Sequence, residues 1–388
     1  MRASCLQENL SRGLAIVGRA VASRPTLPVL SHVLLSTEDG QLKLAATDLE
    51  QFIVCRIGAK VEEEGEITVP ARLFVDLVNS LPSERIELSL EDHTLHLECA
   101  KNEADIKGID AQEFPLLPND GTEYHIWLDP ALFRTMISQV VFAAATDESR
   151  PILTGVLVRF EGNTLTMAAA DGFRLSVRTA HLLEPVPEPI SVVVPAKALN
   201  ELARVSGEEE AQVGVYINPA RSQILFHLQG DAGANQGRIF GIDLVSQLLE
   251  GNFVNYRQIV PQNLNTRTVV DTEQLLRACR TSSIFVRNEA NVIHFEVEPG
   301  ADLGDGGGHV RLTATSTEMG DSTIDVDAEI DGEGLVIAFN VRFLMDVLSV
   351  MESAQVVLET ISSTRPGLLR PVGSDEFLHV IMPMHMRS

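Results

Sequence analysis

Few side chains in this sequence have the type and spacing that metal binding or catalysis requires. His93 and His96 are three residues apart, and in a predicted strand that spacing puts the two imidazoles on opposite faces, which is poor geometry for one metal ion. Four carboxylates do share one face of a predicted strand: Asp325, Asp327, Glu329 and Asp331. Without a partner base or a glycine-bearing calcium loop, such a row indicates a solvated sheet face.

Sequence motifs for catalysis and nucleotide binding are missing. The sequence contains no GxSxG, HExxH, GxxxxGK[ST] or strand-linked GxGxxG. The glycine-rich stretch 304–308 lacks a following Lys-Ser or Lys-Thr, so a hairpin loop is favoured over a phosphate cradle. We therefore expect no catalytic residue, no metal and no cofactor. A hydrolase whose sheet carboxylates converge is the alternative, disfavoured because no activated pair is visible.

The cysteines and the N-terminal stretch bear on the compartment. No close pair or CxxC occurs among the four cysteines, which argues against zinc and a disulfide scaffold and fits a reducing compartment. They are Cys5, Cys55, Cys99 and Cys279. The apolar stretch Leu10–Val21 is interrupted by Arg12 and Arg19 and is followed by no small-residue cleavage site, so neither a signal peptide nor a membrane span is predicted. The expectation is a cytoplasmic protein without membrane association.

The chain repeats its own sequence. Residues 28–35 (PVLSHVLL) reappear at 151–158 (PILTGVLV), and 45–48 (AATD) reappear at 168–171 (AAAD), both at a shift of 123 residues. A further marker opens an apolar periodic stretch three times, at 69–72, 194–197 and 339–342. Unrelated segments would not keep one shift, so three copies of one domain are predicted. Proline-marked connectors set the predicted domains at 1–121, 122–253 and 254–388.

Each repeat has two stretches with helical periodicity. They cover 7–24, 71–80, 129–145, 196–205, 271–281 and 340–351. In the first, Leu10, Leu14, Val17 and Val21 form an apolar stripe. In the second, the predicted stripe is Leu73, Leu77, Val78 and Leu81. Most other segments alternate as strands, for example 85–90 and 324–331, so the predicted fold is α+β, with two helices on antiparallel sheets in each repeat.

Charge is unevenly distributed between the predicted helices and the rest. The chain has a net charge of −24, which taken alone argues against nucleic acid. The six helical stretches nevertheless hold ten basic and seven acidic residues, so the acid lies on the sheets. Ordinary solvated helix faces explain these counts as well as a weakly basic binding surface does.

Five stretches resemble one known family along the whole length of the chain. They are Arg24–Leu30, Thr47–Glu50, Val69–Arg72, Asp171–Leu175 and Met382–Met384. These residues resemble the bacterial DNA polymerase III beta subunit, the sliding clamp family. The resemblance implies three processivity-fold domains in a head-to-tail homodimer. That dimer closes a ring around double-stranded DNA without sequence-specific contacts.

The same resemblance implies a role and a set of partners. The expected role is a non-catalytic processivity factor for the replicative DNA polymerase, placed on DNA by an ATP-driven clamp loader complex. The expected partners are the polymerase alpha subunit, the clamp loader, and other polymerases and repair proteins that carry short peptide motifs. A clamp paralogue that serves repair or specialised polymerases is the alternative, and peptide preference would separate the two.

Site residues follow from the resemblance position by position. The implied DNA contacts are Arg24, Arg72, Lys101, Arg150 and Lys197. The implied partner-peptide pocket is formed by Leu153, Gly172, Arg174, Leu175, Val254, Ile259, Val380, Met382, Pro383 and Met384. The implied dimer interface includes Ala104, Ile106, Ile284 and Phe285.

The sequence departs from the family pattern at a few places. Phe173 stands where His is common, and Val254 stands where Pro is common. A glycine-rich excursion, Gly230–Gly241, lengthens a hairpin of the second repeat, and a tail of four residues, 385–388, follows Met384.

Overall fold

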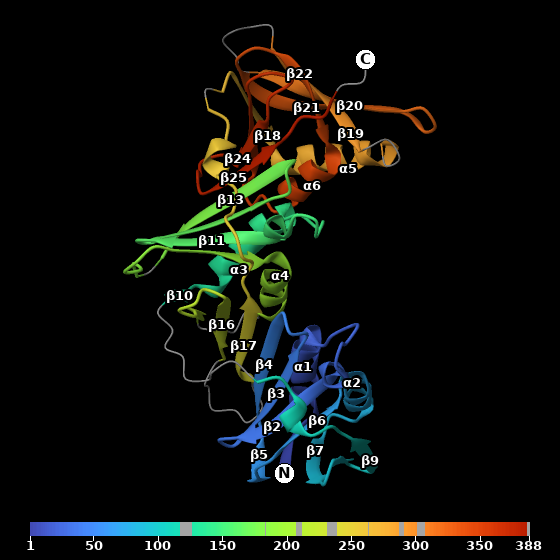
Figure 1. Cartoon of the computed structure of the whole chain (residues 1–388). Helices are drawn as coiled ribbons and strands as arrows, with labels where there is room; N and C mark the ends of the chain where they lie inside the picture. The colour runs from blue at the N-terminus through green and yellow to red at the C-terminus, as the bar shows by residue number, and fades with distance from the viewer. Residues whose placement is uncertain are drawn as a thin grey trace. The chain divides into compact units, whose positions relative to one another are not determined.

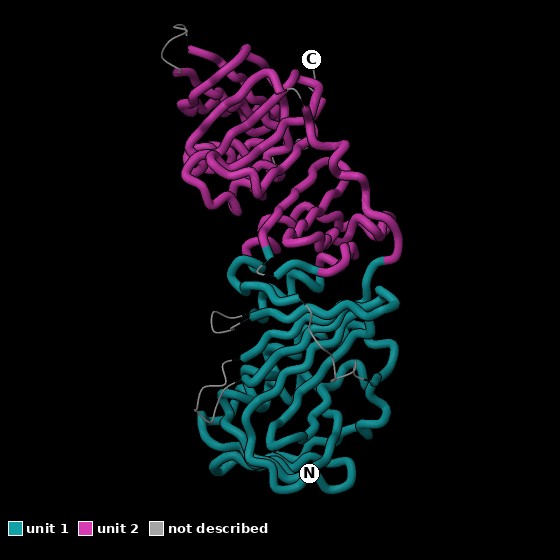
Figure 2. Tube along the Cα trace, turned by 90° about the vertical axis from the view of Figure 1, so that its left-hand side faces the viewer, with its two compact units in different colours: residues 1–134, 182–186, 197–249 teal, residues 135–181, 187–196, 250–388 magenta. Residues whose placement is uncertain are grey.

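The computed structural model describes most of the chain. The described residues are 1–116, 126–182, 184–206, 212–230, 239–262, 264–286, 291–300 and 307–385. The chain divides into two compact units, shown in two colours in Figure 2. Unit 1 comprises Met1–Arg134, Leu182–Val186 and Lys197–Leu249. Unit 2 comprises Thr135–His181, Pro187–Ala196 and Glu250–Ser388.

Two antiparallel sheets form unit 1 within the described residues. The five-stranded sheet has the order β5 (Lys60–Glu63), β1 (Arg2–Leu6), β7 (Arg85–Glu91), β8 (Thr94–Cys99) and β9 (Asn102–Lys107). The eight-stranded sheet has the order β10 (Ile126–Leu128), β15 (Val213–Ile217), β16 (Gln223–Gln229), β17 (Ile239–Gln247), β4 (Gln51–Gly58), β3 (Gln41–Thr47), β2 (His32–Glu38) and β6 (Glu66–Pro70). The second of these sheets joins strands of the first and second repeats.

A single antiparallel sheet of twelve strands runs through the described part of unit 2. Its order is β14 (Ile190–Pro195), β11 (Gly155–Glu161), β12 (Thr164–Ala170), β13 (Arg174–His181), β25 (Phe377–Ile381), β24 (Gly367–Pro371), β23 (Gln355–Thr360), β18 (Thr266–Asp271), β21 (Gly320–Asp331), β20 (Gly307–Ser316), β19 (Val292–Pro299) and β22 (Leu335–Asn340). Strands of the second and third repeats are joined here.

Each repeat contributes two α-helices among the described residues, as predicted (Figure 1). They are α1 (Gln7–Val17), α2 (Ala71–Ser80), α3 (Pro130–Val140), α4 (Ala196–Val205), α5 (Thr272–Phe285) and α6 (Val341–Ser349). Short 3-10 turns accompany them: η1 (Gly18–Ala20), η2 (Pro28–Ser31), η3 (Ala111–Glu113), η4 (Val141–Ala143), η5 (Pro151–Thr154) and η6 (Tyr256–Gln258). The α+β prediction with three repeated domains is confirmed.

Apolar faces of the helices form the cores. Leu10, Leu14 and Val17 of α1 are buried as predicted, whereas Val21 lies beyond α1 and is half-buried. The predicted stripe of α2 is partly wrong, because Leu73 is exposed and Phe74 takes the buried position together with Val78. Phe74 and Val78 are four residues apart and therefore lie on one helix face.

Two strand pairs join neighbouring repeats, and we call them seams. The first seam is the pairing of β4 with β17, in which Gln51 lies opposite Ser246. The second seam is the pairing of β13 with β25, in which Arg174 lies opposite Ile381. In both cases the strand that follows the second hairpin strand of one repeat pairs with the last strand of the next repeat. The seams are therefore equivalent features of the repeat.

Candidate functional site

Aspartates at the start of both seams hold tight turns. Asp171 Oδ1 accepts hydrogen bonds from the backbone N–H groups of Phe173 (2.8 Å) and Arg174 (3.0 Å). Asp48 Oδ1 makes the same bonds in the first seam, to the N–H groups of residues 50 and 51. The two repeats therefore use the same aspartate-anchored turn. Gly172 has φ +95°, a backbone conformation that favours glycine.

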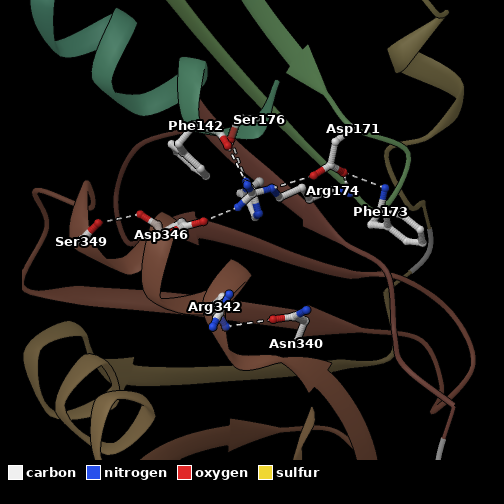
Figure 3. A network of polar contacts seen from close by, with 10 residues as sticks. Phe142, Asp171, Phe173, Arg174, Ser176, Asn340, Arg342, Asp346 and Ser349 are labelled. Carbon is white, nitrogen blue, oxygen red and sulfur yellow. Dashed lines mark hydrogen bonds and ion pairs between the residues drawn. The ribbon is translucent and has the colours of Figure 1, made fainter. Parts of the chain in front are cut away.

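Arg174 is the centre of a polar network at the second seam (Figure 3). Its guanidinium donates to Asp171 Oδ2 (3.0 Å), to Asp346 Oδ2 of α6 (2.5 Å) and to the backbone carbonyl of Phe142 (2.7 Å). It also lies over the ring of Phe343, 4.3 Å from the centroid. Only 10% of the side chain is exposed. Arg174 therefore ties η4, the Asp171 turn and α6 together.

A buried histidine lies beside this network. Ser176 Oγ is 2.7 Å from His379 Nδ1, across the second seam, and the imidazole packs against the ring of Phe142. Burial, and then the positive charge of Arg174, lower the pKa of His379 to about 3. The imidazole is therefore neutral at physiological pH.

Two exposed apolar side chains lie at the turn of the second seam. Phe173 is 58% exposed and Met382 is 40% exposed, and the Met382 N–H donates to the Phe173 carbonyl at 2.8 Å. Val254 and Ile259 are also exposed. Phe173 was not among the predicted pocket residues, although its place directly after an Asp-Gly turn was the signal that could have found it.

The other predicted pocket residues are more enclosed. Leu175 and Val380 lie opposite each other in the seam and are buried, as is Leu153 of η5. Pro383 and Met384 are half-buried, and the Met384 N–H donates to the Ala338 carbonyl. All ten predicted pocket residues belong to unit 2.

The predicted DNA-contacting residues are all exposed. Arg24, Arg72, Lys101 and Lys197 belong to unit 1, and Arg150 belongs to unit 2. Arg72 and Lys197 stand in the first turns of α2 and α4, and Lys197 Nζ is 2.7 Å from Asp48 Oδ2. Exposed pairs of this kind contribute about 0–1 kcal/mol, so Lys197 can exchange this partner at little cost.

The predicted interface residues occupy two places. Ala104 and Ile106 lie on β9, the edge strand of the five-stranded sheet, with Ile106 buried and Ala104 half-buried. Ile284 and Phe285 end α5, where Ile284 is exposed and Phe285 packs on the core of the third repeat.

Other predicted features have plain outcomes. His93 lies in the turn before β8 and not in a strand as expected, and His96 contacts Asp105 across the hairpin. Within the described residues, no group of three or more His, Cys, Asp or Glu could hold a metal ion. None of the helices among them is long and apolar enough to span a membrane. Four predicted features fall wholly or mostly outside the described residues: most of the 230–241 excursion, residues 301–306, the 121/122 boundary and residues 386–388.

Family models match nearly the whole chain in three consecutive parts. They describe the N-terminal, central and C-terminal domains of the DNA polymerase III beta subunit, at residues 1–118, 127–255 and 257–385. The chain belongs to the DNA polymerase III beta subunit family. The predicted family resemblance is thereby confirmed.

Curated relatives and solved structures of beta clamps match over the full chain. The beta sliding clamp of Synechococcus elongatus is 32% identical over 100% of both chains, and that of Staphylococcus aureus is 29% identical over 94% of each. The crystal structure of the Bacillus subtilis DNA polymerase sliding clamp has a TM-score of 0.90 at 28% identity, with 100% of both chains covered. A Pseudomonas aeruginosa sliding clamp has a TM-score of 0.86 at 29% identity.

Proposed function

We propose that this beta clamp is a non-catalytic processivity factor, a ring that encircles double-stranded DNA and tethers the replicative polymerase. The observation that carries the proposal is the match to beta sliding clamps over the whole chain, in sequence and in fold. The repeat supports it as well. Each seam joins the third hairpin strand of one repeat (β4, β13) to the last strand of the next repeat (β17, β25). The two equivalent strands that no seam among the described residues uses are β21 of the third repeat and β9 of the first. Two copies placed head to tail close a ring through that pair.

DNA passes through this ring without being held in one register. We assign the phosphate contacts to Arg24, Arg72, Lys101, Arg150 and Lys197. Lys and Arg contacts to phosphates carry no sequence information and can be exchanged one at a time as the duplex slides. The excess of base over acid in the helical segments is small, and the acidic sheets discourage other contacts with DNA.

Partner peptides dock on the second seam. We assign the surface to Val254, Ile259, Met382, Met384 and Phe173, with Leu153, Gly172, Arg174, Leu175, Val380 and Pro383 forming or positioning its wall. Exposed apolar side chains next to flexible Met side chains suit short aliphatic and aromatic motifs of varied sequence. The partners are the polymerase alpha subunit, the clamp loader complex, and other polymerases and repair proteins.

The dimer interface and the domain limits complete the proposal. Ala104 and Ile106 of one copy meet the Ile284 and Phe285 region of the other. The domains are 1–121, 122–253 and 254–388, a division that the family models at 1–118, 127–255 and 257–385 support. The protein acts in the cytoplasm, where the chromosome is replicated.

Retention on DNA tests the function directly. Labelled protein is loaded onto nicked circular duplex with a bacterial clamp loader and ATP, and half of the sample is then cut to linear form. A ring is lost only after cutting, because it is held topologically. Equal retention on both forms would show direct binding and overturn the proposal. Arg72→Glu should lower loading, whereas Arg221→Glu, at an exposed arginine in the turn after β15, serves as the matched control.

A further inference from the structure

A basic residue stands at the second position of α2, α4 and α6 in the three repeats. These residues are Arg72, Lys197 and Arg342, and all three are exposed. At the first seam this residue has a partner in the turn of the preceding repeat, because Lys197 Nζ lies 2.7 Å from Asp48 Oδ2. The other oxygen of Asp48 accepts the backbone N–H groups of its turn. A helix cation and a turn aspartate thus form an ion pair at the first seam.

At the second seam Arg174 takes the place of the helix cation. Asp171 is the counterpart of Asp48 in the repeat. Its Oδ2 atom accepts a hydrogen bond from Nε of Arg174 at 3.0 Å, and the first-seam counterpart of this arginine is the uncharged Gln51. The turn aspartate of the second seam therefore already has a cationic partner from its own repeat.

Arg342, the counterpart of Lys197, is left without a partner. Within the described residues its guanidinium makes no hydrogen bond or ion pair, and only its backbone N–H is bonded, to Asn340 Oδ1 at 3.0 Å. Asp346 lies one helical turn away, but its Oδ2 atom is held by Arg174 at 2.5 Å. An acid four residues after a base is also the weaker arrangement of a helical pair. A free guanidinium thus stands in the first turn of α6.

This guanidinium belongs to the part of α6 that adjoins the docking surface. Arg342 directly precedes Phe343, whose ring centroid is 4.3 Å from the Arg174 guanidinium, and Figure 3 shows Arg342 on α6 near the polar network. On β22, which leads into α6, the carbonyl of Ala338 accepts the Met384 N–H at 2.8 Å. The start of α6 therefore contacts both the network that supports the turn and the last strand of the docking surface.

The surroundings of Arg342 favour a peptide carboxylate over a DNA phosphate. Next to the second-seam turn stand the exposed apolar side chains of Phe173 and Met382, whereas their first-seam counterparts are Glu50 and Gln247. A free base beside apolar anchors is complementary to a peptide that carries both apolar side chains and an acid. The chain as a whole has a net charge of −24, so an acidic peptide needs a local base of this kind.

We infer that Arg342 binds a carboxylate of the partner peptide, so that the docking surface selects motifs in which an Asp or Glu accompanies the apolar anchors. The inference rests on the proposed docking function and adds a charge preference to it. A guanidinium holds a carboxylate through two parallel N–H···O bonds, which neither an amide nor an ammonium group reproduces. Because the contact is exposed, it changes the choice of motif more than the total affinity, and salt weakens it.

Fluorescent peptides that share their apolar anchors test this inference. Asp, Asn or Lys is placed in turn at each position between or beside the anchors, and anisotropy gives the Kd for the full-length wild type and for Arg342→Gln. At one position the change from Asp to Asn should weaken binding to the wild type about two- to fivefold at about 50 mM NaCl. The same change should leave binding to Arg342→Gln unaltered. Arg342→Glu should reverse the preference and bind the Lys peptide more tightly than the Asp peptide.

A second arginine variant controls for a general change of charge. Arg267 is an exposed arginine of β18, which is separated from β25 by β23 and β24. Arg267→Gln removes the same charge from the same unit, and it should keep the wild-type preference for the Asp peptide. An equal loss of preference in Arg267→Gln and Arg342→Gln would overturn the inference, because net charge alone would then explain it.

The remaining failures are distinguishable. An effect of Asp to Asn that has the same size in the wild type and in Arg342→Gln at every position would overturn the inference and leave the docking surface in place. An Arg342→Gln variant that keeps the peptide preference but loads poorly on circular DNA, as expected of Arg72→Glu, would assign Arg342 to the phosphate contacts instead. A wild type that binds none of the peptides and is not retained on circular DNA would overturn the proposed function itself.

Discussion

The two seams inside the chain share one backbone design but differ in the side chains that hold it. In both, the last strand closes on the turn through the same bond: Gln247 N–H to the Glu50 carbonyl (2.9 Å) and Met382 N–H to the Phe173 carbonyl (2.8 Å). At the first seam these exposed residues are polar, and at the second they are apolar. The comparison shows that the repeat keeps one backbone frame while two exposed side chains change from polar to apolar, which is the change that the proposed docking surface requires.

The ion pairs that brace the seams have also changed position. By the 123-residue shift, Gln51 stands where Arg174 stands and Arg19 stands where Phe142 stands. At the second seam the strand residue Arg174 reaches Asp346, whereas at the first seam Arg19 of η1 reaches Glu201 of α4 at 3.2 Å. Neither amide atom of the buried Gln51 has a hydrogen-bond partner among the described residues. At the second seam the buried Arg178 Nε and His379 Nε2 atoms also lack a partner among the described residues, so each seam leaves buried polar atoms without a hydrogen bond.

The largest loss of stability is expected when Arg174 of the second seam is replaced. Arg174→Met should lower the free energy of unfolding by about 3–5 kcal/mol, because Asp171 and Asp346 lose a buried charged partner. Urea denaturation followed by circular dichroism measures this. A loss below about 1 kcal/mol would show that the network does not brace the seam.

The docking surface should disappear when the second seam is given the side chains of the first. Phe173→Glu with Met382→Gln should weaken binding of a fluorescent polymerase-motif peptide by about 1–3 kcal/mol, because the apolar anchors are lost. Fluorescence anisotropy measures the affinity. Leu49→Ala, an exposed apolar residue in the corresponding turn of the first seam, is the matched control and should leave binding unchanged. Equal affinity for the double variant and the wild type would place the peptide elsewhere.

The buried histidine should make the second seam sensitive to acid. The pKa of His379 is about 3 in the folded chain, whereas the ordinary pKa of a histidine is 6.5, so between these values the unfolded chain binds a proton that the folded chain does not. Stability from this group is present above about pH 6.5 and is lost as the pH falls toward 3, by on the order of 1–2 kcal/mol between pH 7 and pH 5.

A variant with an apolar pair at these two positions, as in the first seam, isolates the contribution of His379. The positions that correspond to Ser176 and His379 are Ile53 and Leu244, which lie opposite each other in the first seam. Ser176→Val with His379→Leu should therefore show a smaller loss of stability between pH 7 and pH 5 in urea titrations. The same loss in wild type and variant would contradict the assignment to His379.

The smallest loss of stability is expected when Arg19 of the first seam is replaced. The Arg19 side chain is 40% exposed, so Arg19→Ala should lower stability by less than about 1 kcal/mol. Urea denaturation of Arg19→Ala and Arg174→Met under the same conditions compares the two losses of stability. A loss as large as that of Arg174→Met would show that the two seams are equally dependent on their ion pairs.

Much of the fold could be predicted from the sequence because its signals are local or repeated. The ranges 71–80 and 196–205 match α2 and α4, and the 123-residue shift placed both aspartate turns. Helix α1 is shorter than predicted, because the chain tightens into η1 at Gly18 and Pro25 follows soon after. Periodicity found most of the buried stripe of α1 but chose Leu73 over its neighbour Phe74 in α2, although adjacent residues point to different sides of a helix and only Phe74 is buried.

The site was less predictable because its contacts are distant in sequence. Arg174 was expected in the pocket, but its partners Phe142 and Asp346 are 32 and 172 residues away, so its burial could not be read from neighbouring residues. Phe173 was noted only as a departure from the family pattern, although its place directly after the Asp171-Gly172 turn favours exposure of its side chain.

Cross-linking across the seam between copies tests the ring most directly. The four native cysteines are buried, so Ala104→Cys on β9 with Ser322→Cys on β21 adds one new thiol to each of the two strands that we propose to meet between copies. The protein is loaded on nicked circular DNA and then oxidised. We expect a covalent closed dimer that stays on the circle in denaturing detergent and is released when the DNA is cut. Open oligomer ladders, or no cross-link between copies, would contradict it.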